Sequence, residues 1–181
     1  MMKSIGLSIA GSDPSGGAGM QADLKVFQQH QVYGTTVVTL LTVQNTTSVD
    51  EVRCLPAGFV IAQLKAVLDD IPPRAAKTGA LGNGEIIEAL STRAQNFDFP
   101  LVMDPVMVSK HGAMLLDKDA TYALRRYLLP CAYLITPNLA EARERLKCVR
   151  SSLSAGLDRG YGRPAVRAAV LAQGLLRAGR I

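Results

Sequence analysis

The chain has 181 residues, of which 48% are hydrophobic and 19% are charged. This is the composition of one globular domain and excludes a disordered chain. No run reaches the roughly 18 apolar residues that a membrane helix needs. The three cysteines, an odd number at wide spacing, fit neither a disulfide framework nor a zinc site. We therefore expect a cytoplasmic protein with no membrane partner.

The basic charge is confined to the last part of the sequence. Residues 1–142 hold 11 Lys/Arg and 13 Asp/Glu, a net charge of −2, whereas residues 143–181 hold 9 and 2, a net charge of +7. Only Tyr161 is aromatic in that basic stretch, so a nucleic-acid surface of interleaved basic and aromatic side chains is not expected. We predict an ordered core over 1–142 and a divergent basic tail over 143–181, with one partly packed helix at 164–179.

Apolar runs of strand length alternate with helical patterns along the core. Strands alternating with helices of this length are typical of βαβ units, which predicts an α/β fold: a mostly parallel central sheet with helices on both faces. The predicted strands are 4–10, 35–43, 49–55, 75–79, 101–104 and 132–136, and the predicted helices are 19–31, 56–71, 84–95, 117–129 and one from 138 onward.

Residues suited to chemistry follow these strands. In parallel sheets ligands bind beyond the carboxyl ends of the strands, so we expect one shared site there. Its members are the glycine-rich loop 11–19, Gln44, Gly79, Asp104 and Asn138.

The loop Gly11-Ser12-Asp13-Pro14-Ser15-Gly16-Gly17-Ala18-Gly19 lies between a predicted strand and a predicted helix. Its glycines let the backbone approach a ligand, and we expect the helix start to present free N–H groups. A P-loop would need Lys after Gly16, where Gly17 stands. Residues 17–22 match G-x-G-x-x-A, but no acid ends the next strand, so a dinucleotide site is only weakly indicated. A tight loop without a ligand remains the alternative.

Three side chains near this loop have both a structural and a functional interpretation. Asp23 could stabilise the helix dipole or accept a hydrogen bond from a substrate hydroxyl. Gln44 offers a donor and an acceptor that suit the ring nitrogen and amino group of a heterocycle. Lys77 could be a charge at the rim or could favour an anionic ligand.

Carboxylates at the later strand ends suit Mg²⁺. Asp104 ends a buried strand, and Mg²⁺ typically takes one or two carboxylates together with phosphate oxygens and waters. Asn138 and Glu141 have the spacing of a helix cap with its capping-box partner, which is the structural alternative to a ligand role. His30 and His111 lack an obvious partner, and we expect both at the surface.

In their order these motifs resemble those of the hydroxymethylpyrimidine/phosphomethylpyrimidine kinases of thiamine biosynthesis, from about residue 4 to 142. The resemblance implies a ribokinase-like fold and transfer of the ATP γ-phosphate to 4-amino-5-hydroxymethyl-2-methylpyrimidine and then to its monophosphate. It is carried by Gly11-Ser12-Asp13, Gly16-Gly17-Ala18-Gly19, Gln21-Ala22-Asp23-Leu24-Lys25, Tyr33-Gly34, Val43-Gln44-Asn45-Thr46, Lys77-Thr78-Gly79, Asp104-Pro105-Val106-Met107-Val108 and Thr136-Pro137-Asn138-Leu139-Ala140-Glu141.

The resemblance also implies roles for individual residues. Gln44 is expected to pair with the aminopyrimidine edge, while Asp23 and the backbone at Gly11 and Ala18 hold the hydroxymethyl end. Asn138 and Glu141 are expected to bind the nucleotide, and Asp104 and Glu141 to bind Mg²⁺.

The sequence departs from the family after Glu141. The family continues with a Lys-Gly-Gly strand and a Gly-Thr-Gly-Cys-Thr loop that supplies the anion hole and the base, and neither is found in this sequence. A shifted reading frame is one hypothesis for the Arg/Gly/Ala-rich stretch 143–163. We expect a fold incomplete at its C-terminus and a chain without catalytic residues that binds the pyrimidine but phosphorylates it scarcely or not at all. A non-catalytic pyrimidine-binding protein and a pyridoxal kinase are the alternatives, and a homodimer remains open.

Overall fold

The structure is a computed structural model that describes residues 4–106 and 118–138. Several sequence predictions fall outside this part of the chain. They concern the helix start at Asp117, the helix after 138, Glu141, His111 and the tail 143–181.

A five-stranded parallel sheet forms the centre of the described fold and confirms the predicted α/β class. Its strand order is β2-β1-β5-β6-β7, so β2 lies on one side of β1 and the later strands lie on the other side. The strand order therefore reverses between β1 and β5. The strands are β1 (Ile5–Ala10), β2 (Tyr33–Val38), β5 (Ala75–Thr78), β6 (Leu101–Met103) and β7 (Leu134–Ile135). Such a reversal opens a crevice at the carboxyl ends of the strands, which is where ligands bind in open α/β sheets.

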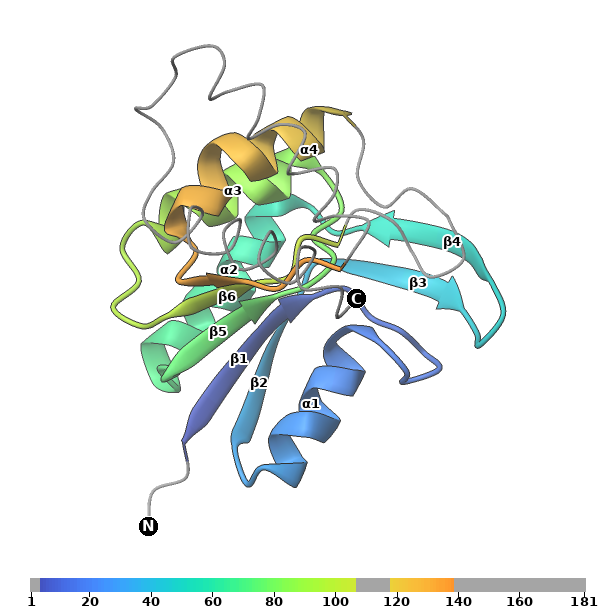
Figure 1. Cartoon of the computed structure of the whole chain (residues 1–181), viewed down its shortest axis with the longest axis horizontal. Helices are drawn as coiled ribbons and strands as arrows, with labels where there is room; N and C mark the ends of the chain where they lie inside the picture. The colour runs from blue at the N-terminus through green and yellow to red at the C-terminus, as the bar shows by residue number, and fades with distance from the viewer. Residues whose placement is uncertain (1–3, 107–117, 139–181) are drawn as a thin grey trace, which may run out of the picture.

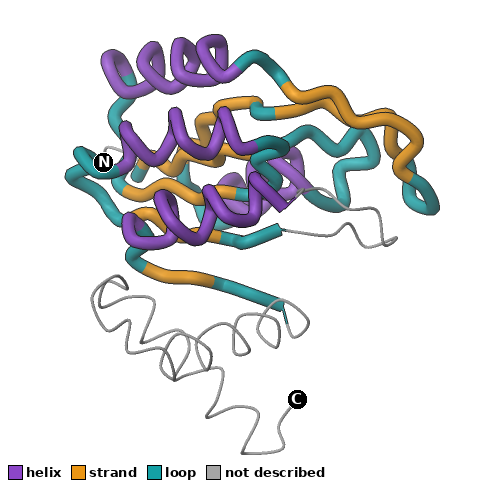
Figure 2. Tube along the Cα trace, turned by 90° about the horizontal axis from the view of Figure 1, so that it is seen from above, coloured by secondary structure: helices purple, strands orange, loops and turns teal. Residues whose placement is uncertain are grey.

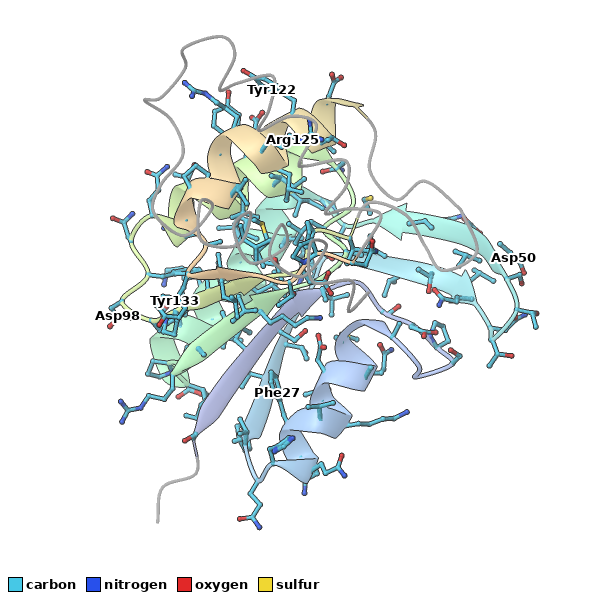
Figure 3. The ribbon with its side chains drawn as sticks, viewed as in Figure 1. Phe27, Asp50, Asp98, Tyr122, Arg125 and Tyr133 are labelled. Carbon is cyan, nitrogen blue, oxygen red and sulfur yellow. The ribbon has the colours of Figure 1, made fainter. Side chains whose placement is uncertain are left out.

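Helices cover both faces of this sheet (Figure 1). On one face α1 (Gly19–Gln29) lies against Gly6 and Gly34, whose missing side chains leave room for Phe27 (Figure 3). The other face carries α2 (Ala57–Asp70), α3 (Gly84–Ala94) and α4 (Lys118–Ala123). Leu7, Ile9, Val37, Val60, Leu64, Ile86, Ile87 and Leu90 are fully or almost fully buried in the main core.

The prediction of one strand over 35–43 is wrong, because the run divides into two strands at Thr39. The N–H of Thr39 donates to Ala10 O, and its hydroxyl donates to Ala80 O at 2.6 Å. The backbone N–H and C=O of Val38 are both bonded to the side-chain amide of Gln63 on α2. These contacts end β2 and turn the chain out of the sheet.

The chain after Thr39 forms an antiparallel hairpin of β3 (Leu40–Gln44) and β4 (Val49–Cys54), which among the described strands pair only with each other. Figure 2 shows this hairpin extending beyond the helices, and Asp50 lies toward its far end (Figure 3). The predicted strand at 49–55 is thus confirmed as one arm of a hairpin. Its effect is to place Gln44 over the carboxyl edge of the main sheet.

The predicted helix 117–129 is also not a regular α-helix throughout. After α4 the chain continues as a π-helical segment over Leu124–Leu128 and a 3₁₀ turn over Leu129–Cys131. Pro130 has no N–H for the helical ladder, which favours such an irregular end. In the part of the chain that the structure describes, no helix has the length and apolar character needed to cross a membrane.

Candidate functional site

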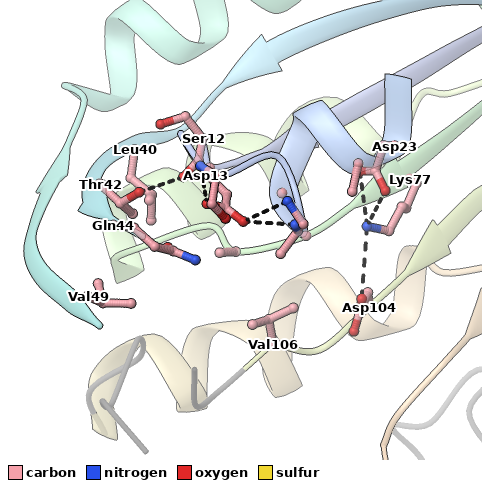
Figure 4. Close-up of a pocket in the computed structure, with 18 of the residues that line it drawn as sticks. Ser12, Asp13, Asp23, Leu40, Thr42, Gln44, Val49, Lys77, Asp104 and Val106 are labelled. Atoms are coloured by element: carbon pink, nitrogen blue, oxygen red, sulfur yellow. Dashed lines mark hydrogen bonds and ion pairs between the residues drawn. The ribbon is translucent and has the colours of Figure 1, made fainter. Parts of the chain in front are cut away.

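A cavity of about 690 Å³ opens at the carboxyl edge of the sheet (Figure 4). This volume is in the range of small-molecule sites. The structure therefore gathers the strand-end residues expected there into one pocket. The described lining comprises Gly11, Ser12, Asp13, Ser15, Gly17, Ala18, Gly19, Ala22, Asp23, Leu40, Thr42, Gln44, Asn45, Thr46, Val49, Lys77, Gly79, Ala80, Asp104, Val106, Thr136, Pro137 and Asn138.

The glycine-rich loop forms one wall of the pocket. Gly19 has a φ of +60°, and a Cβ there would stand 2.5 Å from the carbonyl oxygen of Gly11, so only glycine fits without strain. The carbonyl of Gly11 accepts a hydrogen bond from the N–H of Met20, and its N–H donates to Ala80 O. The loop thus closes tightly onto the start of α1 and onto the end of β5.

Free N–H groups are expected at the helix start, but Met20 donates to Gly11 O and the N–H groups of Ser15, Gly17 and Ala18 just before it are bonded as well. All three donate to the carboxylate of Asp13, which belongs to the same loop. Both Gly11 and Ala18 line the pocket, but their N–H groups are engaged within the protein. What they can still offer a ligand is a carbonyl oxygen, which has two lone pairs.

Gln44 lies at one end of the pocket, with its amide directed into the cavity (Figure 4). The register of the hairpin shifts between Val43 and Gln44, so the strand is irregular where this residue stands. The hairpin turn that follows is organised by Asn45, whose side-chain oxygen accepts bonds from Thr47 and Ser48. Within the described chain no side-chain hydrogen bond of Gln44 is found, so its amide can bind a ligand.

Asp23, Lys77 and Asp104 lie at the other end of the pocket (Figure 4). The ammonium of Lys77 is 3.0 Å from both carboxylate oxygens of Asp23 and 3.9 Å from Oδ2 of Asp104. The hydroxyl of Ser8 donates to Asp23 Oδ2 at 2.6 Å. Asp23 therefore points to the sheet and Lys77, and stabilisation of the helix dipole is not its main interaction. Oδ2 accepts from both Ser8 and Lys77, whereas Oδ1 accepts from Lys77 alone and still has a lone pair for a substrate hydroxyl.

Asp104 and Asn138 follow β6 and β7, which are neighbours in the sheet, and both line the pocket. The Asp104 side chain is 32% exposed. One carboxylate beside an amide fits the protein's share of a Mg²⁺ site, because phosphate oxygens and waters usually complete it. Among the described residues no group of three or more metal-ligating acidic, His or Cys side chains is found. Glu141, the other expected ligand, lies outside the described residues.

Three residues of this site, Ser8, Asp13 and Thr42, have no role predicted from the sequence. Ser8 lies on a buried strand, where a small polar side chain gives little signal. Thr42 donates its hydroxyl to Ser12 O at 2.9 Å and so ties β3 to the glycine-rich loop. Asp13 could have been noticed from the Asp-Pro-Ser order, since Asp before such a turn commonly bonds to backbone N–H groups two residues on.

Comparison with known proteins points to one family. Residues 13–154 match the sequence model described as phosphomethylpyrimidine kinase. A hydroxymethylpyrimidine/phosphomethylpyrimidine kinase of Synechococcus elongatus is 50% identical over 139 residues, which cover 77% of this chain and 53% of that protein. The chain thus spans about half the length of this curated relative.

Solved structures agree with the sequence match. The crystal structure of phosphomethylpyrimidine kinase from Clostridium difficile superposes with a TM-score of 0.73 at 48% identity, covering 78% of this chain and 62% of that one. An ADP complex of Bacillus subtilis pyridoxal kinase superposes with a TM-score of 0.71 at 40% identity, covering 81% of this chain and 56% of that one.

Proposed function

This chain belongs to the phosphomethylpyrimidine kinase family, and from that premise we propose that its pocket binds 4-amino-5-hydroxymethyl-2-methylpyrimidine for phosphoryl transfer from ATP. The observation that carries the proposal is the separation of two chemically different ends in one cavity. Gln44, a donor and an acceptor, stands at one end, and the charged side chains of Asp23, Lys77 and Asp104 stand at the other.

Gln44 is proposed to recognise the pyrimidine. Its side-chain oxygen can accept from the ring's amino group while its NH₂ donates to the adjacent ring nitrogen. A buried polar edge left without these bonds would cost about 1–3 kcal/mol, so this pair selects an aminopyrimidine over a ring without that pattern. The substituent of the ring then extends toward Asp23.

Asp23 is proposed to hold the hydroxymethyl group. Its carboxylate is fixed by Ser8 and Lys77, so the remaining lone pair of Oδ1 has a set direction. Acceptance of the substrate hydroxyl would orient the oxygen that attacks the phosphorus. Positioning of this kind, together with charge neutralisation, accounts for most of the catalysis of phosphoryl transfer.

Asp104 and Asn138 are proposed to hold Mg²⁺ and the nucleotide, as their place in the pocket supports. When bound, Mg²⁺–ATP supplies the γ-phosphoryl group and neutralises its charge. Lys77 lies between Asp23 and Asp104, and its positive charge offsets the repulsion between the two carboxylates at this end of the cavity.

The 181 residues contain no Gly-Thr-Gly sequence, where the family carries its base and anion hole. We therefore propose that this chain, purified alone, binds the pyrimidine but turns it over slowly.

The cytoplasm is the proposed compartment, and the free thiols of Cys54 and Cys131 support it. Partial burial raises the pKa of both thiols, which keeps them protonated at neutral pH.

Pyridoxal phosphorylation is the second candidate, favoured by the likeness to the Bacillus subtilis pyridoxal kinase. Calorimetric titration with the aminopyrimidine and with pyridoxal separates the two, because only the former presents an amino group beside a ring nitrogen to Gln44. Preference for the aminopyrimidine supports the first function, and preference for pyridoxal the second.

Turnover is tested by ADP release with Mg²⁺–ATP and the aminopyrimidine, with Asp104→Asn as the control for contaminating kinase. Very slow release is expected from the chain alone. Turnover of about 1 per second or faster, a rate typical of kinases, that Asp104→Asn abolishes would show that a residue of this chain serves as the base.

A further inference from the structure

Asp13 is the most completely engaged side chain of the glycine-rich loop. The residue is only 3% exposed. Its Oδ1 accepts from the N–H of Ser15 at 2.9 Å and from the Ser15 hydroxyl at 2.7 Å, and its Oδ2 accepts from the N–H groups of Gly17 at 3.2 Å and Ala18 at 2.8 Å. Four donors from one short loop thus converge on a single carboxylate (Figure 4).

Convergent backbone N–H groups before a helix are the usual way in which protein loops bind phosphate and other anions. Here the anion is the loop's own side chain. Burial acts to raise the pKa of Asp13, but the hydrogen bonds from Ser15, Ala18 and Gly17 outweigh it and hold the pKa below its ordinary value of 3.8. The carboxylate is therefore charged at neutral pH.

We propose that Asp13 acts as an internal anion: it fills the anion-binding concavity of the glycine-rich loop, fixes the loop's conformation and excludes phosphate from it. The loop then offers the substrate carbonyl oxygens and apolar surface instead of N–H donors. Phosphate groups of ATP or of a phosphorylated pyrimidine are left to the end of the pocket that holds Lys77 and Asn138. This inference rests on the proposed function for the identity of those phosphates.

The same loop also positions Gln44. The N–H of Ser12 donates to Leu40 O at 3.0 Å, and the Thr42 hydroxyl donates to Ser12 O at 2.9 Å, so the loop is bonded to both ends of the strand segment that precedes Gln44. On its other side the N–H of Asp13 donates to Oε1 of Gln21 in α1 at 2.9 Å. A change at Asp13 should therefore move Gln44 through the loop and β3, which requires no contact between Asp13 and the ligand. Asp13 is a positioning residue.

The test uses inorganic phosphate as the probe and backbone amide NMR as the readout. In the natural chain, phosphate should leave the amide resonances of Ser15, Gly17 and Ala18 unmoved. In Asp13→Gly, which empties the concavity without adding a side chain, phosphate should move those resonances and raise the Tm. Asp98→Asn, which removes an exposed carboxylate far from the loop, should respond like the natural chain (Figure 3).

Movement of the three amides by phosphate in the natural chain would overturn the proposal. So would a folded Asp13→Gly chain that gains no response to phosphate. If Asp13→Gly does not fold, Asp13→Asn is the second variant. Its side-chain NH₂ group would face N–H donors and cannot accept hydrogen bonds from them. The loop amide resonances should therefore shift, and pyrimidine affinity should fall about tenfold or more. Unchanged loop amides in Asp13→Asn would contradict the proposal.

The phosphate measurements need no pyrimidine, so they separate this inference from the proposed function. A chain that shows the expected phosphate response but binds no aminopyrimidine would contradict the proposed function alone. A chain that binds the aminopyrimidine while its loop amides respond to phosphate would contradict the role of Asp13 alone.

Discussion

The ammonium of Lys77 lies 3.0 Å from both carboxylate oxygens of Asp23, across residues 54 positions apart in the sequence. The two side chains are 29% and 16% exposed, so the pair is largely withdrawn from water. Removal of one partner of such a pair strongly destabilises the folded protein, because the remaining charge loses its partner while it stays desolvated.

Lys77→Met should therefore lower the free energy of unfolding by about 1–3 kcal/mol. This loss is smaller than for a fully buried ion pair, because water still screens the partly exposed side chains. Urea unfolding measures this loss. Lys65→Met removes an exposed ion pair with Asp69 on α2 and should cost about 0.5 kcal/mol or less. The double variant Lys77→Met/Asp23→Asn should recover part of the loss, since the charge of Asp23 is no longer left without its partner. Equal costs for Lys77→Met and Lys65→Met would show that the pair has no special role.

Gly19→Ala should disrupt the pocket wall. A φ of +60° costs a residue with a side chain about 1–2 kcal/mol, and the added Cβ would press on the backbone of Gly11. We expect a loss of stability of at least that size and weaker pyrimidine binding. Gly58→Ala on α2 is the matched control, because a Cβ there meets no atom within 4 Å; it should be neutral or stabilising by about 0.5–1 kcal/mol. Equal behaviour of the two variants would argue against a strained loop.

The lowered pKa of Asp13 predicts a specific dependence of stability on pH. Since the pKa is lower in the folded state than the ordinary 3.8, the contribution of this carboxylate is complete above that value. It is lost as the pH falls from about 4 through the folded-state pKa. The difference in unfolding free energy between the natural chain and Asp13→Asn should therefore shrink below about pH 4. A difference that stays constant from pH 6 to pH 3 would contradict the role of the ionised carboxylate.

The sheet could be predicted from the sequence because its strands are short apolar runs separated by helical patterns. The break at Thr39 could not, since Thr35 to Val43 is a continuous β-favouring run and the break depends on contacts with Ala10, Gln63 and Ala80. Tertiary contacts of this kind override local propensity.

The location of the candidate site could be predicted from the sequence, but most contacts between its side chains could not. Parallel strands bring their carboxyl ends to one edge, which is enough to group Asp104 and Asn138. Gln44 reaches the same edge from the antiparallel hairpin of β3 and β4, which depends on the break at Thr39. The pairing of Asp23 with Lys77 depends instead on the register of β1 against β5, which sets Ser8 beside Lys77 and cannot be read from spacing along the chain. Likewise the sequence suggested free N–H groups at the start of the helix, and only the structure places the Asp13 carboxylate against the N–H groups of Gly17 and Ala18 just before it.

The most direct test of the proposed function is calorimetric titration of 4-amino-5-hydroxymethyl-2-methylpyrimidine into the natural chain and into Gln44→Leu. The natural chain should bind, and Gln44→Leu should bind about ten- to hundredfold more weakly with its fold intact, because the amino group and ring nitrogen lose their partners. Gln29→Leu, an exposed position on α1, should bind as the natural chain does. Unchanged affinity in Gln44→Leu, or no binding by the natural chain, would contradict the assignment of this pocket to the aminopyrimidine.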